Sequence, residues 1–164
     1  MRRIVEFLIM CAASVLASGA LAAEAPTTAD VLSKIHRANQ VEMDKARMAI
    51  QVGSTREVRR FGKKVVNDHL GIEKKVAKLA KDEQIELADV AVSGNQDGLP
   101  TGDGFDAAFA REMLSSHRQT ISELEDARRS TTDDKVKKLI DDVLPVLKRH
   151  EEAARHLLDQ ANRS

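Results

Sequence analysis

Four histidines lie on the apolar faces of four amphipathic segments, and these residues are the best suited to chemistry in this sequence. The same number of residues separates His36 from His69 and His117 from His150. Neutral imidazole is a ligand for zinc, copper, iron and nickel, so several inward imidazoles in one core predict a metal site. The fifth histidine, His156, falls off the apolar face of its segment, and we expect it to be solvated.

The free-energy cost of burying polar groups favours a common role for the four histidines. A single buried histidine is ordinarily a core residue with one hydrogen bond. Four buried polar groups without partners would each cost about 1–3 kcal/mol against a stability of about 5–15 kcal/mol. We therefore expect them to satisfy one another or to bind an ion: one divalent metal ion (zinc, copper or iron) with the predicted ligands His36, Glu42, His69, His117 and His150.

An alternative from a different class is equally open to test. The protein would then be a non-enzymatic envelope or stress protein whose buried histidine cluster is structural or senses pH. Stability would in that case fall as the pH drops below about 6.5, the ordinary histidine pKa. A catalytic nucleophile is not indicated at Ser115 or Ser116 beside His117, because neighbouring residues on a helix point about 100° apart and no acid completes a triad.

The apolar residues that position these side chains recur at intervals of three and four, which predicts four helices. The first covers Thr28 to Val52. The second opens on Ser54-Thr55-Arg56-Glu57, which has the form of a capping box. The third runs from about Asp103-Gly104 to about Arg128, and the fourth follows the polar turn 130–132. Since short turns join the first helix to the second and the third to the fourth, the sequence predicts two antiparallel hairpins.

Residues 88–103 between the hairpins have no helical period and contain several helix breakers. Extended, this linker reaches about 50 Å, while a helix of about 28 residues is roughly 42 Å long. The linker can therefore cross the whole bundle. We expect an all-α, ferritin-like antiparallel four-helix bundle, with Pro145 bending the fourth helix, either as a tolerated kink or as a bend that aims His150.

The heights of the histidines along the helices differ between the two hairpins. His36 and His69 are nearly equidistant from Gly53, which predicts that they lie level. In the second hairpin, counting from a turn near Ser130 predicts an offset of roughly 9 Å between His117 and His150.

The N-terminus has the form of a cleaved export signal. A basic start is followed by an apolar stretch and by Ala20-Leu21-Ala22, a small-residue cleavage box. We expect a signal peptide at residues 1–22, a bundle domain at residues 23–164, and a location in the periplasm. The single cysteine, Cys11, lies inside that signal.

Charge and composition indicate few partners. The 26 basic and 26 acidic side chains give a formal net charge of +0, and the absence of Trp and Tyr leaves no stacking platform, so we expect no nucleic acid partner. No run of the mature chain is long and apolar enough for a transmembrane segment. Protein partners are not indicated by the sequence, and a homodimer is compatible with it.

Several motifs together resemble the bacterial domain-of-unknown-function family 4142. They are Asn39-Gln40-Val41-Glu42, Asn67-Asp68-His69, Phe105-Asp106, His117, and Leu144-Pro145 followed by His150. The resemblance covers nearly all of the mature chain. It implies a ferritin-like four-helix bundle with an export signal, often labelled an outer membrane protein, and it points to Glu42, Asp68, His69, His117 and His150 as site residues, but it brings no established activity.

One departure from the true ferritins bears on enzymatic function. Di-iron sites use Glu-x-x-His pairs, but the residues three before His69 and His150 are Val66 and Leu147. A mononuclear, histidine-rich site fits better, and an enzyme is not indicated. For Asp68 we favour a solvated surface position over a role in orienting His69.

Overall fold

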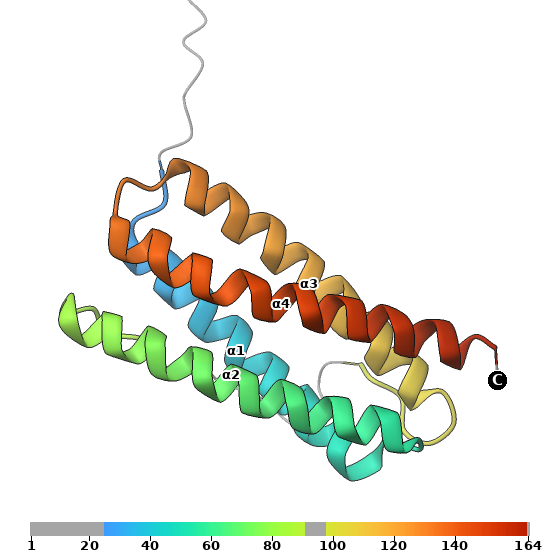
Figure 1. The fold of residues 1–164 in the computed structure, drawn as a ribbon. Coiled ribbons are helices and arrows are strands. Elements are labelled where there is room, and N and C mark those ends of the chain that lie inside the picture. Colours follow the sequence, from blue (N-terminus) through green and yellow to red (C-terminus); the bar gives the residue numbers. More distant parts are fainter. Residues whose placement is uncertain (1–24, 91–97, 164) are drawn as a thin grey trace, which may run out of the picture.

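The protein is a bundle of four long helices, seen in a computed structural model that describes residues 25–90 and 98–163. The helices are α1 (Thr28–Val52), α2 (Arg56–Asp82), α3 (Phe105–Ser130) and α4 (Asp134–Ala161). The predicted all-α antiparallel bundle is confirmed (Figure 1). The bounds expected for the first helix are also those observed, and the helix α4 continues through Pro145.

Side-chain caps set where the helices begin. Thr27 and Asp30 form a reciprocal capping box at the start of α1. At α2, Thr55 is the N-cap and accepts a hydrogen bond from the Val58 amide, so the box predicted on Ser54 is wrong by one residue. The reason lies in another helix, because the Asp106 carboxylate of α3 accepts hydrogen bonds from the amides of Ser54 and Thr55 at 2.8 Å each.

The two hairpins are joined by a connection that crosses the length of the bundle. In Figure 1, α2 ends at the left of the view, whereas α3 begins at the right, beside the turn between α1 and α2. Ile85 and Leu87, after α2, pack on the apolar cluster at one end of the bundle, and Leu99, before α3, packs on the cluster at the other end. This crossover is the ferritin-like connection that the linker length allows.

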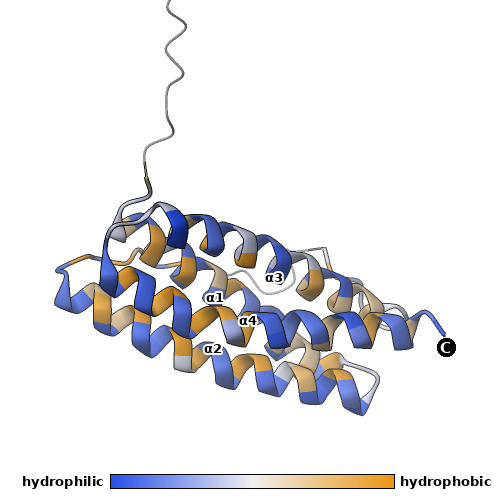
Figure 2. Ribbon diagram, turned by 45° about the horizontal axis from the view of Figure 1, so that its top comes forward, coloured by the Kyte–Doolittle hydropathy of each residue, from blue (hydrophilic) through white to orange (hydrophobic). Residues whose placement is uncertain are grey.

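The core consists of two apolar clusters, one toward each end of the bundle. Each helix has one apolar face, and polar residues cover its outer face (Figure 2). The first cluster includes Leu32, Val76, Leu124 and Ile140, and the second includes Val65, Phe105, Phe109 and Met113. Between the two lies a buried polar layer that belongs to neither cluster: Asn39, Glu42, His69, His117 and His150.

Within the part of the chain that the structure describes, no helix is both long and apolar enough to cross a membrane. The predicted signal peptide at residues 1–22 lies outside the described residues.

Candidate metal centre

Three of the predicted histidines meet at the middle of the bundle. His69 from α2, His117 from α3 and His150 from α4 are at most 1 % exposed. Their ring centroids lie 5.3 to 5.7 Å apart. One nitrogen from each ring belongs to a group in which all three atoms lie within 4.8 Å of one another. Three such atoms fit within about 2.8 Å of a common point, close to the roughly 2 Å of a metal–imidazole bond.

A chain of hydrogen bonds fixes which nitrogen of His69 carries the proton. The carboxylate of Glu73 only accepts hydrogen bonds, so the amide nitrogen of Asn39, 3.1 Å away, donates to it. The amide oxygen of Asn39 therefore faces His69 and accepts from Nδ1–H at 2.8 Å. Because Nδ1 holds the proton of the neutral ring, Nε2 of His69 presents a lone pair to the centre of the bundle.

The same reasoning fixes the other two rings. Nδ1 of His117 lies 2.8 Å from the carbonyl oxygen of Met113, and Nε2 of His150 lies 2.7 Å from Oδ2 of Asp68. Both partners only accept, so each of these nitrogens donates its proton outward. Nε2 of His117 and Nδ1 of His150 are then lone-pair atoms, and they face each other at 3.3 Å. When both rings are neutral, no hydrogen atom lies between these two nitrogens, so they do not form a hydrogen bond with each other.

A carboxylate adds a fourth acceptor to this group. Oε2 of Glu42 lies 3.3 Å from Nε2 of His69 and 3.6 Å from Nε2 of His117. Its other oxygen, Oε1, accepts a short hydrogen bond from the Ser116 hydroxyl. Among the described side chains, Nε2 of His69 is buried without a hydrogen-bond partner. Three imidazole lone pairs and one carboxylate thus surround a buried point with no donor among them, an arrangement that a cation would satisfy.

Burial keeps the imidazoles of His69 and His150 neutral. It lowers the pKa of His69 to about 4, although the carboxylate of Glu42 opposes the shift. It also lowers the pKa of His150 to about 4, against the hydrogen bond from its ring to Asp68. The pKa of Asp68 itself is below its ordinary value: burial raises it, but hydrogen bonds from Lys64 and His150 outweigh this. Near neutral pH both histidines are in the form that binds metal.

The tilt of helical side chains explains why the heights expected from counting residues do not show which histidine rings meet. A Cα–Cβ bond leans toward the N-terminus of its helix, so a residue before a hairpin turn leans away from the turn and a residue after it leans toward the turn. His117 and His150 therefore lean toward each other, and their ring centroids lie 5.3 Å apart despite the offset expected from counting. By the same tilt, the level pair His36 and His69 lean apart.

His36 consequently lies outside the group of three histidines. Its Nδ1 contacts Oε1 of Glu73 at 2.6 Å, and the side chain is 15 % exposed. His69 leans instead toward residues closer to the turn, where it meets Asn39 and Glu42. His36 is connected to the centre through Glu73 and Asn39.

Two contacts of the centre were not found by reading the sequence. The interpretation of Asp68 as a solvated neighbour is wrong, because its carboxylate binds His150 across the bundle. Adjacent helical residues diverge by about 100°, so Asp68 reaches α4 rather than His69. Glu73 was not predicted either; its position four residues after His69 on the same helix face was the available signal. His156 is exposed, as expected.

The protein is thus a ferritin-like four-helix bundle that contains a buried cluster of three histidines. The model of the family described as a domain of unknown function, DUF4142, matches residues 13–157, and the chain belongs to this family. A comparison with curated proteins found no match.

Solved structures of CopM have the same fold. The Cu(I)-bound form has a TM-score of 0.71 and covers 82% of this chain and 97% of its own. The Ag-bound form obtained by soaking has a TM-score of 0.70, with 83% and 97% covered. The apo form has a TM-score of 0.71, with 82% and 98% covered. Each is 18% identical to this chain, a likeness that concerns the fold.

Proposed function

We propose that this protein binds one metal ion, foremost copper, through His69, His117 and His150, with Glu42 as a fourth ligand. The observation that carries the proposal is the set of four acceptors around one buried point, without a donor between them. Imidazole nitrogen suits copper, zinc and iron, and bundle cores commonly hold metal ions between facing helices. The bound forms of the structurally similar CopM favour copper among these.

Outer hydrogen bonds support this role of the three rings. A metal-bound imidazole commonly donates its other N–H to a carboxylate, carbonyl or amide oxygen, which holds the ring in place and increases its basicity. His69 donates to Asn39, His117 to the Met113 carbonyl, and His150 to Asp68. These partners keep the three lone pairs directed inward before any ion arrives.

Metal analysis of the protein, purified without an affinity tag, tests the proposal. Titration of the chelator-treated protein with Cu(II), Cu(I), Zn(II) and Fe(II) should give one ion per chain for copper. His117→Ala should abolish this binding, while His156→Asn, which changes the exposed histidine, should retain it. If none of these ions binds stoichiometrically, or if His117→Ala binds as the unaltered protein does, the proposal is wrong.

We also propose that the protein acts in the periplasm after cleavage of residues 1–22, as a bundle domain of residues 23–164. The basic and apolar N-terminal sequence supports this location. The first described helix begins at Thr28, a few residues after the proposed cleavage box. N-terminal sequencing of protein recovered from the periplasm should begin at Ala23. Recovery of the uncut chain in the cytoplasm would contradict the proposal.

A second candidate function is a response to pH, and the lowered pKa values of His69 and His150 favour it. In this case the cluster would weaken the fold in acid without needing a metal ion. The pH dependence set out in the Discussion, measured with and without metal, separates the two functions.

A further inference from the structure

The three imidazoles are enclosed, so an ion must pass between helices to reach them. The two helices within each hairpin pack together extensively, whereas the seams between the hairpins, α1 with α3 and α2 with α4, have far fewer contacts. Metal access through one of these two seams requires the least movement of the bundle.

The seam between α2 and α4 leads to the side of the site on which the ring of His150 carries its proton. Phe61 lies edge-on to the ring of His150, with the two centroids 6.0 Å apart. Beside it, Asp68 accepts the outward N–H of His150 and is held by Lys64 at 2.7 Å. An ion arriving here would meet an aromatic ring, a carboxylate already held by Lys64, and the protonated edge of an imidazole rather than the lone pair of an imidazole.

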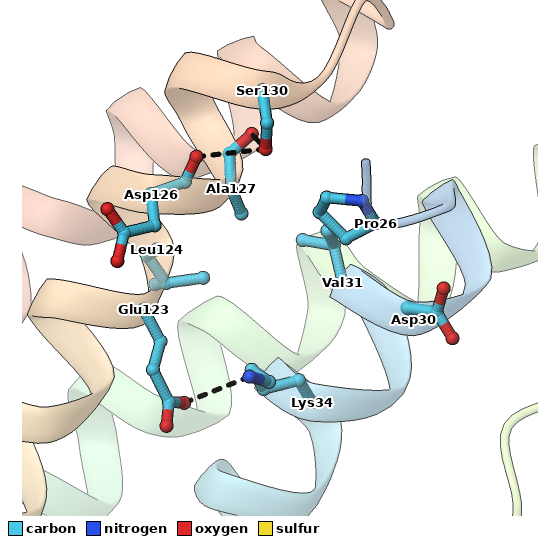
Figure 3. Close-up of a pocket in the computed structure, with 9 residues that line it drawn as sticks. All are labelled: Pro26, Asp30, Val31, Lys34, Glu123, Leu124, Asp126, Ala127 and Ser130. Carbon is cyan, nitrogen blue, oxygen red and sulfur yellow. Dashed lines mark hydrogen bonds and ion pairs between the residues drawn. The ribbon is translucent and has the colours of Figure 1, made fainter. Parts of the chain in front are cut away.

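The seam between α1 and α3 is open and leads toward Glu42. A groove of about 670 Å³ lies along it. An ion pair connects α1 and α3 at each end of the groove: Lys34 with Glu123 at 3.1 Å, visible in Figure 3, and Lys45 with Glu112 at 2.6 Å. The two pairs tie α1 to α3, and Arg37 is a further charged residue that lines the groove. Small side chains line the seam between the pairs, among them Ala38, Ser115 and Ser116.

Ser116 connects this groove to the ligands. Its side chain lines the groove and donates its hydroxyl hydrogen to Oε1 of Glu42. The other oxygen of the same carboxylate faces the lone pairs of His69 and His117. A cation that replaces the Ser116 hydroxyl at Oε1 of Glu42 is therefore already bound to an anionic ligand. Only the carboxylate group of Glu42 then separates it from the imidazoles.

We propose that the groove between α1 and α3 is the route by which a metal ion enters and leaves, with the Ser116–Glu42 hydrogen bond as its gate. This inference rests on the proposed metal site. It predicts that an obstacle in this groove slows loading and release together and leaves the equilibrium affinity unchanged, since the ligands are untouched.

A bulky label attached after folding tests the route. In a Cys11→Ser background, which removes the native thiol, Ala38→Cys places a cysteine in the groove and Ala153→Cys places one in a hollow beside α2 and α4. Both alanines are half-buried on helices, so the variants are matched. Each protein is reacted with a fluorescein maleimide, and Cu(II) loading and chelator-driven release are followed by stopped-flow absorbance against the unlabelled protein.

The label at position 38 should slow both rates by about tenfold or more, which corresponds to about 1.4 kcal/mol of added barrier, while the label at position 153 leaves them unchanged. Unchanged rates with the label at position 38, or slowing with the label at position 153, would overturn the route but not the site. Absence of Cu(II) binding by the unlabelled protein would overturn both, so the two failures are distinguishable.

Discussion

At the scale of single residues, the site depends on side chains that never face its centre. Asp68 directs the ring of His150, and Lys64, one helical turn away, holds Asp68. A second pair on the same helix, Lys78 with Asp82, has the same spacing and lies far from the cluster on an exposed surface. The two pairs look alike in sequence, but only the first has an imidazole across from it.

Asp68→Ala should therefore weaken copper binding about 10- to 100-fold, the usual effect of removing the carboxylate partner of a metal-bound histidine. Without Asp68, the ring of His150 loses the acceptor that keeps its Nδ1 lone pair inward. Competition with a chromophoric copper chelator measures the change in affinity. Asp82→Ala is the control and should bind as the unaltered protein does; equal affinities in the two variants would mean that Asp68 has no orienting role.

At the scale of helices, the close approach of α1 and α2 sets the distance across which His69 meets Asn39 and Glu42. Gly62 permits this approach, because a Cβ at this position would lie 2.7 Å from the carbonyl oxygen of Ala46. Gly71, on the same helix, has nothing within 4 Å of the corresponding point. The close contact with α1 therefore requires a glycine at position 62, whereas no contact requires one at position 71.

Gly62→Ala should destabilise the protein by about 1–3 kcal/mol, because the added methyl group forces α1 and α2 apart. Gly71→Ala should instead stabilise it by up to about 1 kcal/mol, since alanine is the better helix former. Urea denaturation followed by circular dichroism gives both values. Similar gains in stability for the two variants would show that the helices are not in contact at Gly62.

At the scale of the whole molecule, the polar layer makes the stability of the metal-free bundle depend on pH. The folded-state pKa of both His69 and His150 lies near 4, below the value of about 6.5 expected in the unfolded chain. Between these values the unfolded state binds more protons, so stability is fully present above about pH 6.5 and is lost as the pH falls toward 4. Glu42, Asp68 and His117 face the same two rings.

The melting temperature of the chelator-treated protein should consequently fall between pH 7.5 and pH 5, and saturating copper should reduce the fall because bound imidazoles stay neutral. Thermal unfolding followed by circular dichroism measures this. His69→Leu should flatten the dependence, whereas His156→Asn should not. A melting temperature that is the same at both pH values, in the unaltered protein and in His69→Leu, would remove the pH response.

The sequence by itself determined the bundle and most of its polar layer. Spacing of apolar residues gave four helices, and turn lengths paired them. The stripe positions of His69, His117 and His150, with Glu42 at the edge of its stripe, placed these side chains inward, although the same pattern also placed His36 there. All of this depends on local geometry, in which a residue three or four positions away is on the same face.

Only the tertiary structure decided which polar residues meet. Counting residues from a turn gives the height of a Cα atom, but the opposite tilt of side chains on antiparallel helices moves the rings of His117 and His150 together and separates His36 from His69. The partners of the rings, Asp68 for His150 and Glu73 through Asn39 for His69, also depend on how neighbouring helices face each other. Spacing within one helix can show that two side chains share a face, as Glu73 and His69 do, but not which residue of a neighbouring helix each one meets.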